Sequence, residues 1–542
     1  MPESLEPPLG NALQQWADSQ KALDDAIQRY LDSTIALESN LYGNTYHIDA
    51  TAIRSTLIKT WLDDSPIADK HSKLVRAQEH LNQMRNSLLS VNTLPLEILL
   101  KIFRFAAFNT FHAQYNTPIP FSYQQDDHQD LLVITHVCSY WRKVLLNTPS
   151  FWSRFVFDSH YTHEHECERA EMYSARANGI PQSLSFYEHF NGTSFCLRDV
   201  NMMTRLIESR LDNLTQLTLL NLESIELVTQ IIRYWLNKRK PGVLRSLTIQ
   251  LEPSILHPTR IYTGRPARAR RAEPMLSPVR TLSLRGIAFA WDSPIYWNLV
   301  VLRIGNLHPT ISPTIHELLG VLSACPLLHT LRLYGMSILH GDPTLLNPVY
   351  LTELENLNLA LLSPQDVGLL LPRIFAQSKD LSLRIAFQAW SAQSFSVLYP
   401  FLNRTNITRL FIEQCIDAES GRVIGDCLSA LPNLHTLILD LGLRPGDSCL
   451  SGLTRLEKSG TGRVPRCPML HTLYIVTGSV SVEAVQEVVE THPLLRKLRF
   501  SACYVDPFEE ELRYWLKPFV EDVKFDLRLD MAALFDWYHI MT

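Results

Sequence analysis

The chain has 542 residues, of which 46% are hydrophobic and 19% charged, so it exceeds the length of one domain and can build a large core. Its formal net charge of −5 excludes any argument from overall charge for a nucleic-acid or membrane partner. Nine scattered cysteines form no C-x-x-C pair, and the acidic, proline-containing start does not have the pattern of a signal peptide. No apolar run approaches the ~20 residues of a membrane span. We therefore expect a soluble protein of the cytoplasm or the nucleus.

Residues 1–92 are predicted to form a helical segment. Apolar residues recur at helical spacing from Leu13 to Leu37, and Leu74, Leu81 and Leu88 then recur at intervals of seven, with Met84 between them. The pattern fits a helical hairpin that folds on itself or on the next domain. The heptad spacing also fits a dimerising coiled coil.

Residues 93–157 are predicted to form a second helical module. Pro95 opens a helix, and Glu97 places a carboxylate in its first turn, where the backbone N–H groups are free. A second helix is expected from Leu131 through Leu145, and it ends at the Asn147-Thr148-Pro149 break. Phe151 and Trp152 follow. From the pattern alone, this module could also be a cap on the domain that follows.

This module resembles the F-box. The resemblance lies in Leu94-Pro95-x-Glu97-Ile98 with Ile102-Phe103, in Val137-Cys138-x-x-Trp141-Arg142, and in Phe151-Trp152. It implies docking on a Skp-type adaptor, and through the adaptor a link to a cullin and to ubiquitin-dependent degradation. The residues expected to form the adaptor-binding module are Leu94, Pro95, Glu97, Ile98, Ile102, Phe103, Val137, Trp141, Arg142 and Trp152.

Two features depart from the family pattern. Residues 109–130 lengthen the connection between the two helices, and Phe151 stands where the family more often has leucine. An alternative is therefore a vestigial box that no longer binds an adaptor.

Residues 158–542 are predicted to form a solenoid of repeats with a C-terminal cap. A Pro-x-Leu-x-x-Leu-x-apolar frame recurs, most clearly at Pro326-Leu327-Leu328-His329-Thr330-Leu331-Arg332-Leu333. Proline ends a helix, and the last two apolar positions share one face of a short strand. The apolar frame starts at Leu214, Leu244, Val279, Leu299, Leu328, Leu354, Ile407, Leu434, Leu470 and Leu495, with a damaged copy at Leu381 and Leu383.

Copies start 20 to 36 residues apart, except for one step of 53, and helix-patterned segments such as Ile315–Leu322 and Val482–Val489 lie between them. This period is close to that of leucine-rich repeats. We expect an α/β fold with parallel strands on a concave face and helices on the convex face. A helical segment, an F-box and such repeats resemble the F-box/leucine-rich-repeat architecture, in which the repeats capture the protein to be ubiquitinated. The alternative is a repeat scaffold that binds partners without ubiquitination.

The concave face is the predicted binding surface. The middle residue of each strand is expected to point outward, which selects Thr248, Ser283, Arg303, Arg332, Asn358, Phe411, Ile438, Tyr474 and Arg499. Beside them lie Gln250, Arg285, Tyr334, Glu413, Asp440 and Ser501. The residues expected to bind the substrate are Arg285, Arg303, Arg332, Tyr334, Asn358, Phe411, Glu413, Asp440, Tyr474 and Arg499.

These residues indicate the chemistry of the ligand. Arg303 and Arg332 would stand side by side on neighbouring strands, where an anion relieves their repulsion. Exposed Phe411, Ile438 and Tyr474 would form an apolar strip beyond them. We therefore expect an unknown protein substrate with an acidic segment and an apolar segment.

Three other patterns carry weaker signals. Gly446-Asp447-Ser448 with Asp536 and His539 resembles the Ser and Asp–His elements of an esterase. Too little chain follows Ser448 for the α/β domain of such an enzyme. His160, His163, His165 and Cys167 have metal-ligand spacing, although a solvated helix start explains them as well. The arginines between Arg260 and Arg271 fit a nuclear address or a solvated loop. No Walker loop, dinucleotide fingerprint, H-E-x-x-H or kinase motif set is present, so we expect a non-enzymatic protein with no cofactor and no metal.

Overall fold

The computed structural model describes the backbone of most of the chain and divides it into two compact units, Met1–Pro95 and Leu96–Thr542. The described residues are 7–43, 71–79, 82, 86, 89–108, 127–158, 163–188, 195, 199–208, 210, 212–237, 243–251, 260–261, 273–340, 347–386, 397–413, 420–442, 445–454, 456–459, 462–506 and 509–526. Within these residues, no helix combines the length and the apolarity that crossing a membrane requires.

The first unit contains the helix α1 (Pro7–Gly43), a helical stretch over 71–79 and the short 3-10 helix η1 (Ser90–Thr93). Apolar side chains of α1 such as Trp16, Ile27 and Tyr30 are solvent-exposed. The expected helix is therefore present, and both the hairpin and the coiled coil stay predictions. Leu81, Met84 and Leu88, on which the heptad pattern depends, lie outside the described residues.

The second unit begins with a module of three helices, α4 (Leu96–Phe108), α5 (Asp127–Val137) and α6 (Ser139–Leu146). Pro95 directly precedes α4, as its pattern predicts. The single helix expected from Leu131 to Leu145 is wrong, because Cys138 has extended backbone angles and splits it into α5 and α6. The Cys138 sulfur then accepts the backbone N–H of Trp141 at 3.5 Å and caps α6. A helix-patterned run thus contains a capped corner that periodicity alone does not show.

The remainder of the second unit is built on one parallel sheet of 14 strands. Their order in space follows their order along the chain, and all neighbouring strands are parallel, which defines a solenoid. The strands are β1 (Arg154–Asp158), β2 (Gln182–Tyr187), β3 (Leu214–Leu222), β4 (Ser246–Leu251), β6 (Thr281–Arg285), β8 (Val301–Gly305), β9 (Thr330–Tyr334), β11 (Asn356–Asn358), β13 (Leu381–Ala386), β14 (Ile407–Glu413), β15 (Thr436–Asp440), β18 (Thr472–Val476), β20 (Lys497–Ser501) and β22 (Asp522–Asp526).

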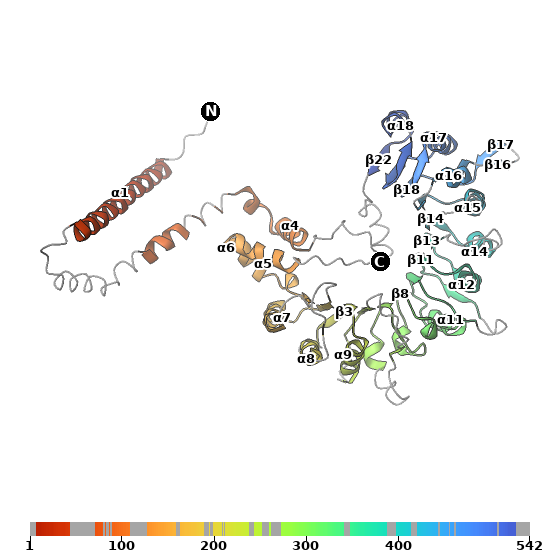
Figure 1. The fold of residues 1–542 in the computed structure, drawn as a ribbon, viewed down its shortest axis with the longest axis horizontal. Helices are drawn as coiled ribbons and strands as arrows, with labels where there is room; N and C mark the ends of the chain where they lie inside the picture. The colour runs from red at the N-terminus through yellow and green to blue at the C-terminus, as the bar shows by residue number, and fades with distance from the viewer. Residues whose placement is uncertain are drawn as a thin grey trace. The chain divides into compact units, whose positions relative to one another are not determined.

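Helices and short helical turns connect these strands and line the outer, convex side of the curve, whereas the sheet lines its inner side (Figure 1). The connecting helices are α7 (His163–Ala177), α8 (Val200–Glu208), α9 (Ile225–Asn237), α11 (Ile315–Ser323), α12 (Pro364–Leu370), α14 (Tyr399–Arg404), α15 (Ser420–Ser429), α16 (Asp447–Thr454), α17 (Val482–Thr491) and α18 (Glu509–Leu516). The 3-10 turns are η2 (Pro149–Phe151), η3 (Pro294–Tyr296), η4 (Pro309–Ile311) and η6 (Leu371–Arg373). The predicted α/β repeat fold is therefore present.

Small two-stranded sheets lie within the segments that connect the strands of the large sheet. They pair β5 (Arg260–Ile261) with β7 (Ala288–Phe289), β10 (Val349–Leu351) with β12 (Ile374–Ala376), β16 (Leu456–Ser459) with β17 (Gly462–Pro465), and β19 (Ser479–Ser481) with β21 (Tyr504–Asp506). Only Arg260 and Ile261 of the basic segment Arg260–Arg271 belong to the described residues, so its role stays open.

The predicted apolar frame forms the core between sheet and helices. Leu328, Leu331 and Leu333 are fully buried, and the equivalent residues of the other nine copies are at most 2% exposed. The damaged copy is also a strand, β13, with Leu381 and Leu383 buried. The ten copies and the damaged copy leave out β1, β2 and β22. At β22 the apolar spacing is present in Val520, Val523 and Phe525 and was not recognised. The predicted C-terminal cap therefore begins with a further strand of the same sheet.

A left-handed backbone position follows most strands and was not predicted. It lies three residues after the middle of the strand, at Asn306 (φ 49°), Gly335 (φ 55°) and Thr477 (φ 55°), among others. At Asn306 and Thr477 the N–H group bonds to the next strand, for example Asn306 N to Tyr334 O at 3.0 Å. This turn bends the chain out of the strand and towards the convex side. Glycine and asparagine favour it, since they tolerate positive φ.

Candidate functional site

The first candidate surface is the exposed apolar side of the helical module, which we call the module face. Helix α4 carries apolar residues on two sides. Leu99, Phe103 and Ala107 are buried, whereas Ile98 is 42% exposed and Ile102 40% exposed. The residues of the module face are Ile98, Ile102 and Phe105, which share one side of α4. The other exposed apolar residues of the module are Leu96 in the first turn of α4, Val133 and Val137 on α5, and Tyr140 on α6.

The buried side of α4 assembles the module. The Phe103 ring packs on the Trp141 ring with centroids 4.8 Å apart, so α4 is fixed against α6. Arg142, which is exposed, donates from Nε to the Thr135 carbonyl at 2.9 Å and spans the corner at Cys138. Trp141 and Arg142 therefore maintain the shape on which the exposed residues are presented.

Trp152 joins the module to the solenoid. Its indole N–H donates to the Leu145 carbonyl at 2.9 Å, the Arg176 guanidinium lies 4.4 Å from its ring centroid, and the Tyr173 ring packs edge-on at 5.0 Å. Burial raises the pKa of Tyr173 to about 12, so this tyrosine stays neutral at physiological pH. The module and α7 thus share one aromatic cluster.

The predicted adaptor residues therefore divide by exposure. Pro95, Glu97, Ile98, Ile102, Val137 and Arg142 are exposed, and Leu94 and Trp141 are half-buried. Phe103 and Trp152 are 1% exposed, so within the predicted module they serve as internal packing. Sequence reasoning missed Phe105, which is 69% exposed, and Val133. Phe105 lies three residues after Ile102 on the same side of the helix, and this spacing could have identified it.

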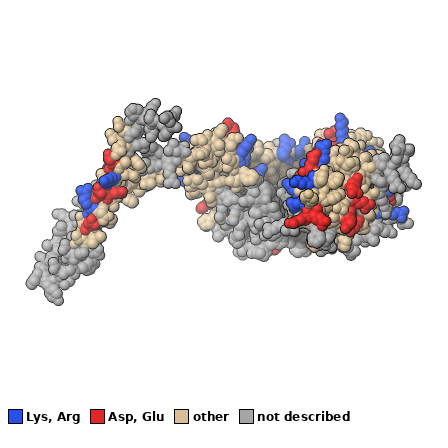
Figure 2. Space-filling view, turned by 90° about the horizontal axis from the view of Figure 1, so that it is seen from above, with Lys and Arg blue, Asp and Glu red and all other residues tan. Residues whose placement is uncertain are grey.

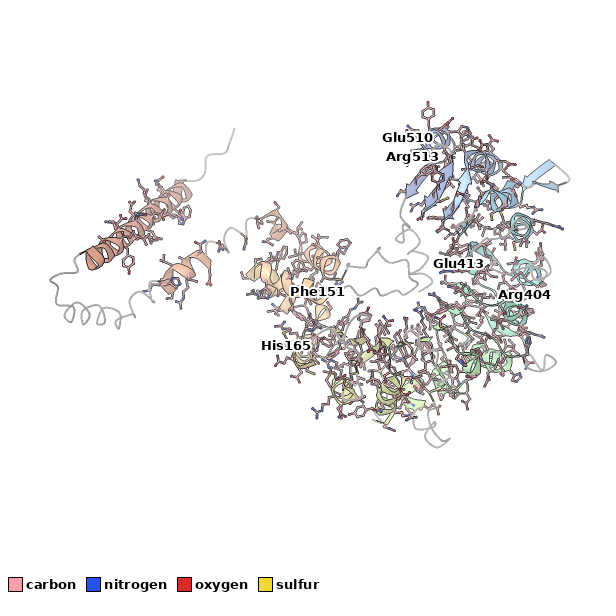
Figure 3. The ribbon with its side chains drawn as sticks, in the orientation of Figure 1. Phe151, His165, Arg404, Glu413, Glu510 and Arg513 are labelled. Carbon is pink, nitrogen blue, oxygen red and sulfur yellow. The ribbon has the colours of Figure 1, made fainter. Side chains whose placement is uncertain are left out.

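The second candidate surface is the side of the sheet that faces away from the helices, which we call the concave face. Strand pairing places the predicted middle residues in one unbroken row, from Thr248 and Ser283 through Arg303, Arg332, Asn358, Arg384, Phe411, Ile438 and Tyr474 to Arg499. Figure 3 shows Glu413 on the strand side of the solenoid and Arg404 on the helix side. Arg384 was not predicted, because the damaged copy lacks the regular apolar spacing from which the middle residue of a strand is identified.

The expected apolar strip is wrong. Phe411 is 4% exposed and Ile438 is fully buried, whereas Tyr474 is half-buried. Neighbouring strands of a sheet are only ~4.8 Å apart, so large side chains in one row cover one another. The Arg384 guanidinium lies 4.6 Å from the Phe411 ring centroid and shields it, and Ile438 lies in register between Phe411 and Tyr474.

Three arginines of the concave face lie on adjacent strands, and we call Arg285, Arg303 and Arg332 the arginine cluster. Arg303 and Arg332 are in register on β8 and β9, and Arg285 is in register with Gly305. Burial, followed by the positive charge of Arg332, lowers the pKa of Arg303 to about 10. Among the described residues Arg303 has no ion-pair partner, and its Nε is buried without a hydrogen-bond partner.

An aromatic ring completes this part of the face. Tyr334 is in register with Gly305, and a Cβ atom at residue 305 would lie 2.2 Å from the Tyr334 Cζ atom. The ring therefore lies over the glycine, and the Arg332 guanidinium stacks 4.6 Å from its centroid. Arg285 donates from Nε and Nη2 to the Asn306 side-chain oxygen at 3.0 and 3.2 Å once that amide is oriented to satisfy both groups. These contacts orient the guanidinium groups of Arg285 and Arg332.

Several other charged residues of the concave face have partners. Arg384 donates to Glu413, and Arg499 lies 3.4 Å from Asp522. Asp440 accepts from the Gly442 N–H at 3.0 Å and from the Thr477 hydroxyl. Asn358 is 2% exposed and in register between Arg332 and Arg384. Lys and Arg side chains occur beside Asp and Glu side chains on the face of the molecule shown in Figure 2, so its surface is not uniformly basic.

Among the described residues, which do not include His160, the remaining sequence signals form no assembled site. Ser448 lies on α16 and Asp447 accepts the Ser481 N–H at 2.8 Å, whereas Asp536 and His539 lie outside the described residues. Burial, followed by Glu171 and Glu166, raises the pKa of the Cys167 thiol, which opposes the thiolate that a metal needs. Within the described ranges no group of three or more His, Cys, Asp or Glu side chains could hold a metal ion.

Comparison with known proteins assigns no family. No protein-family model matches this chain, and no curated protein matches it. A crystal structure of a protein from Bacteroides fragilis is similar, with 12% sequence identity, a TM-score of 0.29, and coverage of 62% of this chain and 85% of that chain. A likeness at this TM-score carries no argument about function.

Proposed function

We propose that this protein is the substrate-recognition subunit of a Skp–cullin–F-box ubiquitin ligase, with an F-box-like module and a leucine-rich-repeat solenoid. The observation that carries the proposal is the exposure of Ile98 and Ile102 on α4 while Leu99 and Phe103 on the same helix are buried. A helix with apolar residues on both sides serves two packing surfaces. One surface builds the module, and the other is available to a partner.

The exposed residues support an adaptor as that partner. Exposed apolar residues grouped on one element mark interaction sites in soluble proteins. Pro95, Ile98, Ile102 and Val137 are both exposed and part of the F-box resemblance. Part of the resemblance therefore consists of residues that an internal core does not need.

The junction at Trp152 supports the second part of the proposal. An adaptor-bound module that presents a substrate needs a stiff connection to the surface that holds the substrate. Phe155 and Tyr173 have ring centroids 5.7 Å apart, and β1 pairs with β2, so the module continues directly into the sheet. The solenoid then acts as a rigid arm whose concave face holds the target protein.

Affinity for a purified Skp-type adaptor tests the proposal, with the double variant Ile98→Asp/Ile102→Asp as the critical protein. Burying one isoleucine side chain contributes about 1.5–3 kcal/mol, so the variant should bind at least about 100-fold more weakly. The matched control is Leu327→Asp, which places the same charge at a 58%-exposed leucine of the solenoid and should bind as the wild type does.

Two outcomes would contradict the proposal. Wild-type protein that does not bind the adaptor would favour the alternative, a repeat scaffold with a vestigial box. Equal binding by the double variant and the wild type would show that the adaptor uses another surface. Trp141 is less suitable for this test, because its ring packs on Phe103 and its substitution would disturb the whole module.

A further inference from the structure

A pocket lies between α11 and the segment that follows β7, and we call it the α11 pocket. Its volume of about 520 Å³ is large enough for a small molecule or a long side chain. Helix α11 lies on the outer side of the curve, so this pocket is separate from the concave face (Figure 1). The residues that determine its chemistry are Trp291, Asp292, Tyr296, Trp297, Glu317 and Gly320.

Gly320 leaves space in the α11 pocket. It lies inside α11, where glycine is less favourable than any residue except proline. Close packing explains other helix glycines of the solenoid, because a Cβ atom on Gly421 would clash with the Ser448 carbonyl and one on Gly452 with the Gly421 carbonyl. A Cβ atom on Gly320 would have no packing neighbour within 4 Å. Packing therefore does not require a glycine at this position, and its effect is to keep the pocket open.

Aromatic rings form one side of the pocket. Trp291 is 5% exposed, its ring stacks on the Tyr296 ring with centroids 5.3 Å apart, and its indole N–H donates to the Ile311 carbonyl at 3.2 Å. These contacts fix this side of the pocket before a ligand binds, which lowers the entropy that binding would cost. Trp297 is 40% exposed, and an exposed indole ring attracts a cation.

The charged residues of the pocket are both acidic. Asp292 is exposed and, within the part of the chain that the structure describes, forms no hydrogen bond or ion pair. The Glu317 Oε2 accepts from the Thr314 N–H at 2.8 Å and from the Thr314 hydroxyl at 3.0 Å, which caps α11. Among the described residues that line the pocket, none is a lysine, an arginine or a histidine. Capping therefore explains Glu317, whereas the Asp292 carboxylate is available to a cation.

We propose that the α11 pocket binds a basic side chain, arginine or lysine, of a partner protein. The aliphatic stem of this side chain lies over Gly320 and against Trp297, and its charged end binds the Asp292 carboxylate. A guanidinium group donates to a carboxylate and stacks on an aromatic ring, so arginine should bind more tightly than lysine. This inference goes beyond the proposed function, since it uses neither the module face nor the concave face.

Binding of synthetic peptides to the full chain tests the inference, with no adaptor present. Three otherwise identical neutral peptides carry arginine, lysine or glutamine at the centre. The wild type should bind the arginine peptide at least about 10-fold more tightly than the glutamine peptide, a difference of about 1.4 kcal/mol. Asp292→Asn should remove this preference, because it removes the charge and keeps the shape. The matched control Glu353→Gln neutralises an exposed carboxylate outside the pocket and should retain the preference.

Filling the pocket provides a second test. Gly320→Leu places a side chain in the open space and should weaken binding of the arginine peptide at least about 10-fold. Its thermal midpoint should be unchanged or raised, because leucine favours a helix more than glycine does. The matched control Ser323→Leu places the same residue at an exposed position of α11 outside the pocket and should bind the peptide as the wild type does.

Several outcomes would overturn the inference. Equal affinity of the wild type for the three peptides would remove its basis, and so would wild-type binding of the arginine peptide by Asp292→Asn or by Gly320→Leu. A lowered midpoint for Gly320→Leu would mean that the space beside this glycine is not open. Tighter binding of choline than of either basic peptide would assign the pocket to a small organic cation. Adaptor binding by the Gly320→Leu protein reports separately on the proposed function.

Discussion

At the scale of single residues, His492 is a buried titratable group in the solenoid core. It is 2% exposed, its Nδ1 lies 3.0 Å from the Val488 carbonyl, and its Nε2 has no partner. Burial lowers its pKa, because protonation would place a charged ring in an apolar site, and the hydrogen bond to Val488 opposes this only in part. The unfolded chain therefore takes up this proton at a higher pH than the folded chain does.

We predict that stability falls as the pH drops through about 6.5, the pKa of the unfolded histidine, with a slope from this group of at most about 1.4 kcal/mol per pH unit. Above that pH neither state is protonated and the contribution vanishes. His492→Cys should show a smaller loss, since cysteine stands at the equivalent position before proline in the copies at Cys325 and Cys467. Urea unfolding of both proteins at about pH 7.5 and pH 5.5 measures the difference. Equal losses would exclude His492 as the source.

The row of middle residues on the concave face follows from the sequence alone, because side chains alternate along a strand and the apolar frame fixes the register. The burial of Phe411 and Ile438 does not follow, since it depends on what neighbouring strands place beside them. The ion pair between Arg384 and Glu413 also could not be predicted from the sequence, because it connects two copies of the repeat. Sequence patterns report which face a residue occupies, and not which long side chain covers it.

At the scale of elements, the recurring stretch Cys325–Leu333 explains how each turn of the solenoid closes. The Cys325 thiol donates to the Tyr296 carbonyl at 2.8 Å, and Nδ1 of His329 lies 2.9 Å from the Leu327 carbonyl. His471 repeats the second contact with Met469 at 2.6 Å. The recurring cysteine therefore bonds to the backbone of the preceding turn of the solenoid, and the recurring histidine bonds to the backbone of its own bend. Their repetition reflects this turn geometry. Helix–strand alternation was predictable from periodicity, whereas the corner at Cys138 depends on one capping contact.

The same stretch supplies a paired test of the predicted register. Leu331 on β9 is fully buried, whereas Leu327 in the preceding turn is 58% exposed. Leu331→Ala should lower the free energy of unfolding by about 2–5 kcal/mol, because it removes buried methyl groups and leaves a cavity. Leu327→Ala should change it by less than about 0.5 kcal/mol, as surface substitutions usually do. Urea denaturation followed by circular dichroism measures both, and similar losses would mean that the strand register is wrong.

At the scale of the whole molecule, the second unit combines a module with an exposed apolar face and a sheet with an arginine cluster. The fold class and the succession of the module and the solenoid were predictable, because a periodic pattern and a short motif encode them locally. The division of α4 into a buried side and an exposed side was not predictable, since both sides carry isoleucine, leucine or phenylalanine. Function in this account depends on that division, because the module face must be free to bind a partner.

Hydrogen exchange of the full chain, with and without a bound Skp-type adaptor, tests the central claim most directly. The account predicts slower exchange in α4 and α5 when the adaptor is bound and unchanged exchange in β8, β9 and β11, since the module face and the concave face bind different partners. Slower exchange confined to the solenoid strands, or no change in α4 and α5 at saturating adaptor, would contradict the claim that this module is the adaptor-binding element.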